Sequence, residues 1–173
     1  MLDNMLFVAR VTSWVARIAL WLSVAGLVLM TAIIAAQVVF RYLLNDSLAW
    51  SEPAAVMIMG WFIFLGAAVG VREGYHLSFD VLLYFLPAKV CGWLHSISDG
   101  VVVGFGGCMM WFGTELAAKT ANNALPSLGI SGAFDFIPII AGGVLLVIFS
   151  IERIVRRFAG LPTARFGETV LEE

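Results

Sequence analysis

Four long apolar segments limit the folds open to this chain. They cover roughly residues 18–40, 51–71, 90–112 and 136–155. A helix of about 20 apolar residues matches the thickness of the hydrocarbon core of a bilayer. Because lipid cannot hydrogen-bond to bare backbone, each segment is expected to be an α-helix. The sequence therefore predicts an all-α integral membrane protein with four transmembrane helices, in which residues 1–173 form a single membrane domain.

The composition agrees with burial in lipid. Hydrophobic residues make up 61% of the 173 residues, charged residues only 13%, and the mean hydropathy is +0.97. Soluble domains carry about 25% charged residues. The net charge of −2 argues against nucleic-acid binding, which needs a clustered basic face. We therefore expect contacts with membrane lipids and none with nucleic acid.

Capping residues predict where the second and fourth spans begin, and the length of the first apolar segment predicts that it is a span. Ser51 and Asp135 stand where the second and fourth spans begin, as N-capping residues do. The first apolar segment is longer than the 7–15 apolar residues of a signal peptide. It is therefore expected to stay in the mature protein as the first span.

Basic residues predict the orientation in the membrane. Eight of the ten Lys and Arg residues flank the spans on one side, and only Arg41 and Lys119 lie on the other. Because the basic side of a membrane protein faces the cytoplasm, both termini are predicted to be cytoplasmic. Segment 77–86, closed by Pro87, is apolar but too short to cross the membrane. We expect it to be a short interfacial amphipathic helix between the second and third spans, with an irregular loop folded onto the bundle as the alternative.

Glycine pairs mark two spans as candidates for close helix packing. Gly66 and Gly70 form one GxxxG pattern, and Gly100 and Gly104 form another. Small residues at this spacing let two helices approach closely. The partner helix could belong to this chain or to another subunit.

Asp99 is the one acidic residue well inside a span, and His95 lies one helical turn before it. Ionisable groups inside spans are candidates for function because lipid makes them costly. Three interpretations stay open. The two residues could form a local polar pair near the inner interface, reached by Arg17 or Arg72. They could form a proton or ion site, or they could contact a partner subunit.

The sequence contains no nucleophile–base set, phosphate-binding loop or metal-ligand cluster. We therefore predict no catalytic, substrate-binding or metal-binding residues, no cofactor and no enzymatic activity. Two other functions stay open. His76 and His95, the two histidines, could carry haem in a membrane anchor of an electron-transfer complex. The chain could also be an autonomous small transporter, although such carriers usually show interrupted helices or charges near the middle of the membrane.

Two stretches carry a resemblance to a known family. They are residues 40–52, FRYLLNDSLAWSE, and residues 61–80, which begin WFIFLGAA and end REGYHLSFD. They resemble the small membrane subunit of tripartite ATP-independent periplasmic (TRAP) transporters, the DctQ-like family. In that family an Arg-Tyr pair ends the first span and a Trp with acidic residues opens the second. An aromatic run then leads into Leu-Gly-Ala, and Arg, His and Asp follow the span. One departure is Pro53, which stands where the family often has a second acid.

The resemblance implies a function and partners. Such a subunit pairs with a large multi-span TRAP membrane subunit, which imports an organic acid by sodium symport. A periplasmic substrate-binding protein delivers that acid. The small subunit is expected to be a scaffold in the bacterial inner membrane that braces the large transport subunit.

The resemblance also suggests candidate contacts with partner subunits. These are Arg41, Tyr42, Trp50, Glu52, Arg72, His76 and Asp80. Arg41 could pair with Asp46 or Glu52 and fix the outer hairpin, or it could extend toward lipid headgroups.

Arg72, His76 and Asp80 follow one another at intervals of four residues. They are expected to anchor the interfacial segment or to meet the large subunit. An alternative role for His76 is to sense pH.

Overall fold

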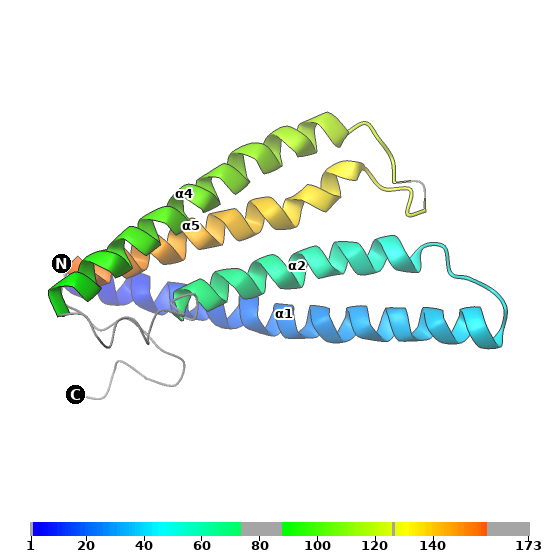
Figure 1. Cartoon of the computed structure of the whole chain (residues 1–173), viewed down its shortest axis with the longest axis horizontal. Helices are drawn as coiled ribbons and strands as arrows, with labels where there is room; N and C mark the ends of the chain where they lie inside the picture. The colour runs from blue at the N-terminus through cyan, green and yellow to red at the C-terminus, as the bar shows by residue number, and fades with distance from the viewer. Residues whose placement is uncertain (1, 74–87, 126, 159–173) are drawn as a thin grey trace.

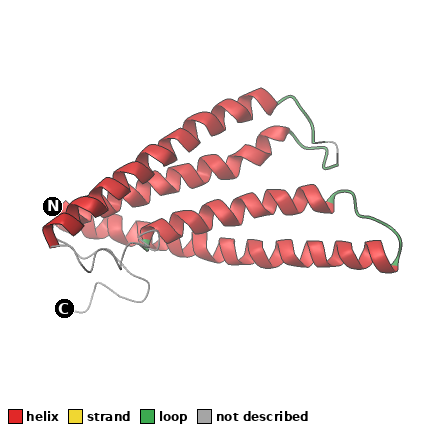
Figure 2. Ribbon diagram, in the orientation of Figure 1, coloured by secondary structure: helices red, strands yellow, loops and turns green. Residues whose placement is uncertain are grey.

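The computed structural model describes residues 2–73, 88–125 and 127–158. In these residues the chain forms the long helices α1 (Leu2–Leu43), α2 (Ser51–Arg72), α4 (Ala88–Thr120) and α5 (Ile137–Phe158), and the short 3-10 helix η1 (Gly132–Phe136). The described ranges contain no strand (Figure 2), only an isolated bridge between Ala124 and Ser131. Four helices are long and apolar enough to cross a membrane. The predicted all-helical fold with four membrane-spanning helices is confirmed.

The helices extend beyond the apolar segments that predicted them. α1 begins at Leu2 rather than near residue 18, and α4 continues to Thr120 rather than ending near residue 112. Hydropathy marks only the lipid-buried part of a helix, whereas the backbone hydrogen bonds continue through polar turns. At 1.5 Å per residue, the 42 residues of α1 make a helix roughly 63 Å long. Because the hydrocarbon core is about 30 Å thick, α1 must project beyond it or tilt.

The beginnings of the second and fourth spans differ from expectation. Trp50, not Ser51, is the N-cap of α2, and the Ser51 hydroxyl donates to the Leu48 carbonyl at 2.6 Å. Asp135 lies inside η1, whose N-cap is Ser131. In both places a polar side chain is satisfied by the preceding loop, and the sequence around the helix start does not reveal how that loop turns.

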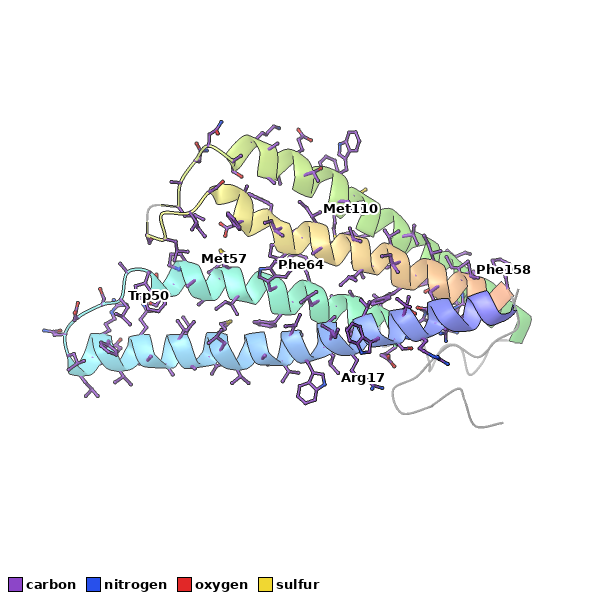
Figure 3. All side chains as sticks on the ribbon, turned by 180° about the vertical axis from the view of Figure 1, so that it is seen from behind. Arg17, Trp50, Met57, Phe64, Met110 and Phe158 are labelled. Atoms are coloured by element: carbon purple, nitrogen blue, oxygen red, sulfur yellow. The ribbon has the colours of Figure 1, made fainter. Side chains whose placement is uncertain are left out.

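The long helices stand in a row in the order α1, α2, α5, α4 (Figure 1). Each packs against its neighbour in the row, and no other pair of long helices makes comparable contact within the described ranges. The α1–α2 and α4–α5 hairpins lie close together where α1 begins and α5 ends, and they diverge toward their loops. We call these the terminal end and the loop end. Away from the terminal end, where the start of α1 crosses α5 (Figure 1 and Figure 3), the sides of the helices that face out of the row carry many exposed apolar residues.

The buried apolar core is narrow and lies between neighbouring helices of the row. Its fully or nearly fully buried members are Ala16, Ala19, Leu65, Ala68, Val69, Val71, Met109, Leu146 and Phe149. Several are small, which lets the helices approach closely without large interlocking side chains.

Glycines set the closest approach between α4 and α5. A methyl group on Gly143 would lie 2.8 Å from the Gly106 carbonyl oxygen, and one on Gly106 would lie 2.9 Å from the Gly143 carbonyl oxygen. Gly142 meets α2 in the same way, since its methyl group would lie 2.6 Å from Cβ of Phe64. Figure 3 shows Phe64 on the side of α2 that faces α5. These contacts lie outside the GxxxG patterns of the sequence.

The glycines of the GxxxG patterns occupy different surroundings. A methyl group on Gly66 would lie 2.9 Å from the Ser23 hydroxyl oxygen of α1, whereas one on Gly70, Gly100 or Gly104 would meet nothing within 4 Å in the structure as described. Gly100 and Gly104 are exposed. Their predicted role in close packing therefore stays a prediction, and it now requires a helix from outside the described residues.

Candidate functional site

Charged side chains from three helices gather at the terminal end of the row. We call them the ionic cluster: Arg72, Glu73, Asp99, Glu152, Arg153, Arg156 and Arg157. Asp99 is completely buried, and Arg153 is only 6% exposed. Buried charges are stable only when they are paired and hydrogen-bonded, so the geometry of each pair matters.

Asp99 joins α4 to α5. Its two carboxylate oxygens lie 3.4 Å from Nε of Arg153 and 2.9 Å from Nη2 of Arg157. Residues 153 and 157 are one helical turn apart, so both guanidinium groups approach from the same face of α5. Arg157 also donates to the Ser96 hydroxyl at 3.1 Å. The ion pairs that the structure describes for Asp99 come from Arg153 and Arg157 of the neighbouring helix α5, rather than from Arg17 or Arg72, which the sequence suggested.

Arg72 links the ends of α1, α2 and α5. Its guanidinium donates to the Ser13 hydroxyl of α1 at 2.7 Å. It lies 3.2 Å from a carboxylate oxygen of Glu73 and 3.7 Å from one of Glu152. It also stacks over the Phe149 ring, 5.8 Å from the centroid. The described contacts of Arg72 thus lie inside the chain, although the sequence suggested it as a contact for a partner.

Arg153 closes the C-terminal end of α2. Its Nη1 donates to the carbonyl oxygens of Val71 and Arg72 at 2.6 and 3.2 Å. These carbonyls belong to the last turn of α2, where no further helical N–H is available to them. A cation at a helix C-terminus also interacts favourably with the helix dipole. One guanidinium group therefore joins the ends of α2, α4 and α5.

The ionic cluster is built to hold helices in place. Four arginines face three acids in the described contacts, so its charges are largely balanced. Removing one member of a buried pair leaves an uncompensated charge and costs about 3–5 kcal/mol. No group of three or more His, Cys, Asp or Glu side chains in the described ranges could hold a metal ion. His95, half-buried one turn before Asp99, adjoins the cluster.

A second polar site lies at the loop end, between α1 and α2. The Gln37 side-chain amide donates to a carboxylate oxygen of Glu52 at 3.2 Å. Beside this bond is an open hollow of about 210 Å³, lined by Gln37, Arg41, Ser47, Leu48, Ala49 and Glu52. Arg41 forms no ion pair with Asp46 or Glu52 within the described ranges. The hairpin is instead closed by the Gln37–Glu52 bond and by backbone bonds to the Phe40 carbonyl.

The remaining candidate contacts divide into two groups. Tyr42 and Trp50 are exposed at the loop end, with 78% and 46% of their surfaces accessible. His76 and Asp80, like the predicted interfacial segment 77–86, lie outside the described residues. Trp50 stands beside the hairpin loop (Figure 3). A partner could therefore reach Tyr42 and Trp50 without disturbing the ionic cluster.

The sequence did not single out Glu152, Arg153 or Arg157. The basic residues of α5 served there only to predict orientation. Arg153 and Arg157 are four residues apart, and the predicted span 90–112 contains a single acid, Asp99. This pattern was the signal that could have predicted their ion pairs with Asp99. That signal becomes specific only once α4 and α5 are known to be neighbours.

In comparisons with known proteins, the family model and the relatives below are all components of TRAP transporters. Residues 30–160 match the family model described as tripartite ATP-independent periplasmic transporters, DctQ component. The C4-dicarboxylate TRAP transporter small permease protein DctQ of Vibrio cholerae is 36% identical over 61 residues, which are 35% of this chain but only 26% of that relative. The sialic acid TRAP transporter small permease protein SiaQ of the same organism is 28% identical over 124 residues, 71% of each chain. A putative TRAP transporter small permease protein of Haemophilus influenzae is 26% identical over 139 residues, 78% of this chain and 83% of the relative.

Proposed function

Because this chain belongs to the DctQ family of TRAP transporter components, we propose that it is the scaffold that braces the large membrane subunit of such a transporter. As a small permease subunit with four membrane-spanning helices, it is a multi-pass protein of the inner membrane and not an enzyme. In the proposed complex the large subunit imports an organic acid by sodium symport. A periplasmic binding protein delivers that acid to the membrane.

One observation supports the scaffold role above the others. The charged groups within the row are concentrated at its two ends, and residues 18–40, 53–71, 100–114 and 136–151 contain no Asp, Glu, Lys, Arg or His. Carriers that move ions or acids usually place charged groups near the middle of the membrane. Buried ion pairs hold the helices of the row together at one end, and its middle is apolar. This arrangement fits a subunit that supports another membrane protein better than one that conducts solute across the membrane.

The proposed orientation places the ionic cluster at the cytoplasmic side. The basic residues of α5 and of the start of α1 lie at the terminal end, together with both described ends of the chain (Figure 1). The positive-inside rule then assigns that end to the cytoplasm. Segment 77–86 would lie in the same interface, and the loop end with Arg41, Tyr42, Trp50 and Glu52 would face the periplasm.

The outward side of α4 is our proposed contact for the large subunit. Gly100 and Gly104 are exposed there and have open space beside them. Small exposed residues allow the backbone of a second helix to come close. The exposed hairpin residues Tyr42 and Trp50 would instead contribute to docking of the periplasmic binding protein.

The relatives suggest the class of substrate. One is named for C4-dicarboxylates and another for sialic acid, and both compounds carry carboxylates. We propose an organic acid as the transported compound, bound by the partner proteins rather than by this chain.

The test is reconstitution in liposomes. The chain is co-expressed with the large membrane subunit and the periplasmic binding protein of a TRAP transporter from the same organism, and uptake of labelled C4-dicarboxylate or sialic acid is driven by a sodium gradient. We expect uptake only when both membrane proteins are present, and none from this chain alone. Uptake by this chain alone, or equal uptake by the large protein without it, would contradict the proposal. Labelling of Asp46→Cys from the periplasm tests the orientation separately.

A further inference from the structure

A stripe of alternating arginine and tryptophan residues runs along the first half of α1. Arg10, Trp14, Arg17 and Trp21 follow one another at intervals of four, three and four residues. At 3.6 residues per turn they fall within an arc of about 60°. Trp14 and Trp21 are 67% and 69% exposed, and both arginines are exposed. We call these four residues the Arg–Trp stripe.

The Arg–Trp stripe points away from the rest of the chain. The buried residues of this part of α1, including Thr12, Ala16, Ala19 and Ser23, lie roughly 180° around the helix from it. Ser23 marks the α2 side, because its hydroxyl donates to the Phe62 carbonyl at 2.6 Å. Figure 3 shows Arg17 projecting from the side of α1 turned away from α2. Whatever contacts the stripe must come from outside the described chain.

The two arginines of the stripe differ from those of the ionic cluster. Every arginine of that cluster has an acidic partner. Neither Arg10 nor Arg17 forms an ion pair or a side-chain hydrogen bond with any part of the chain that the structure describes. The stripe therefore presents two unneutralised guanidinium groups.

The register of α1 places the stripe at the level of lipid headgroups. Gln37 pairs with Glu52 at the loop end, and Ser13 pairs with Arg72 at the terminal end. Twenty residues separate Arg17 from Gln37, which corresponds to roughly 30 Å along a helix. That is the thickness of the hydrocarbon core. Placing Gln37 at one boundary of the core puts Arg17 at the other, with Trp14 and Arg10 beyond it and Trp21 one turn inside.

We propose that the Arg–Trp stripe binds the phosphate headgroups of anionic phospholipids. A guanidinium group offers a planar set of donors that matches the oxygens of a phosphate. Tryptophan prefers the membrane interface, where its ring contacts acyl chains and its N–H reaches polar groups. Two unpaired positive charges favour an anionic over a zwitterionic headgroup. The assignment to the cytoplasmic leaflet rests on the orientation in the proposed function, whereas the binding itself does not.

The test measures lipid binding by the purified full chain in detergent. Native mass spectrometry after mixing with equal amounts of phosphatidylglycerol and phosphatidylcholine should show a preference for phosphatidylglycerol of about five- to thirtyfold, the range expected for one or two basic residues near a membrane surface. Arg10→Gln combined with Arg17→Gln should abolish this preference. Arg10→Lys with Arg17→Lys should retain part of it, because the charges remain but the planar fork is lost.

The matched control removes a positive charge at the other end of the row. Lys119→Gln should leave the phosphatidylglycerol preference unchanged, because Lys119 is already paired with Glu115. An unchanged preference in the Arg10→Gln/Arg17→Gln variant would overturn the proposal. If, in addition, the same variant no longer co-purifies with the large subunit in a separate co-expression, the stripe is a protein contact instead. The lipid measurement uses this chain alone, so a negative result there does not contradict the transporter role. A negative result in the uptake experiment likewise does not contradict the lipid site.

Discussion

Arg153 combines two tasks that no other basic side chain could combine as well. Its guanidinium neutralises Asp99 and also donates to the last carbonyls of α2. Arginine keeps its charge when buried and directs its donors along fixed, coplanar directions. A lysine ammonium could satisfy either the acid or the carbonyls, but it has no planar fork to span both. The residue therefore fixes the relative positions of α2, α4 and α5 at one point.

The pairing of Asp99 leads to a prediction for a single substitution. Asp99→Asn keeps the size of the side chain but leaves Arg153 and Arg157 without their shared counter-charge. We expect a loss of about 3–5 kcal/mol in the free energy of unfolding, as for other broken buried ion pairs. Thermal unfolding of the detergent-solubilised protein, followed by circular dichroism, measures the change. Glu115→Gln is the control, because the Glu115–Lys119 pair is exposed and its loss should change stability by less than about 1 kcal/mol.

Asp99 and Arg153 should also be coupled energetically. If their contact at 3.4 Å stabilises the fold, the loss in free energy of unfolding of the double variant Asp99→Asn/Arg153→Met should be smaller than the sum of the losses of the two single variants. We expect a coupling energy of about 0.5–3 kcal/mol, the range for residues in one network. The same cycle with Lys119→Met, at the other end of α4, should be additive within about 0.5 kcal/mol. An additive result for Asp99 and Arg153 would mean that the carbonyls of α2, rather than Asp99, are the important partners of Arg153.

At the scale of helices, the contact between α4 and α5 depends on two glycines. A methyl group at Gly143 would lie 2.8 Å from the Gly106 carbonyl oxygen and 3.1 Å from Cβ of Met109. Neither neighbour can move easily, because one is backbone and the other is attached directly to it. The helices must therefore separate to accept any side chain at this point.

Gly143→Ala should accordingly destabilise the protein by about 1–3 kcal/mol through overpacking. Gly107→Ala is the matched control, because Gly107 is exposed on α4 and has nothing within 4 Å of a methyl group. It should be neutral or stabilising by up to about 1 kcal/mol, as alanine favours the helix. Thermal unfolding in the same detergent compares the two variants. Equal stability of both would show that the α4–α5 approach is looser than the structure indicates.

The predictable parts of the fold were those governed by lipid. Long apolar runs predicted four spans, because any segment in the hydrocarbon core must be apolar and helical. Asp99 was recognised as unusual for the same reason. Its partners and the glycines at Gly106 and Gly143 were not predicted, since they depend on which helices are neighbours. The extra turns of α1 were missed because Asp3, Arg10 and Arg17 interrupt the apolar run there.

At the scale of the whole molecule, the row is fixed at one end by ion pairs and exposes many large apolar side chains along its length. The ionic cluster joins α1, α2, α4 and α5 at the terminal end, and the hairpins diverge toward their loops (Figure 1). Large apolar side chains stay exposed along α1 and α4, among them Trp21, Val101 and Phe105 at 69%, 67% and 62%. Some of this surface suits lipid. The part with exposed glycines suits the close approach of another helix.

Gly104→Leu tests which part of that surface meets the large subunit. The leucine would project into open space in this chain alone, so its thermal unfolding should match that of the unsubstituted protein. If α4 is the contact, the leucine would separate the two helices and weaken association by about 1–3 kcal/mol. That corresponds to a fall of about five- to 150-fold in the association constant, measured by recovery of the tagged large subunit on dilution.

Ala32→Leu provides the matched change on the opposite edge of the row. Ala32 is exposed on α1, on the same outward side as the Arg–Trp stripe, where we expect lipid. Recovery of the large subunit should therefore be unaffected by it. If Ala32→Leu lowers recovery and Gly104→Leu does not, α1 rather than α4 is the subunit contact. That result would also remove the room for lipid headgroups beside Arg17, because a helix packed on this side of α1 would cover the stripe.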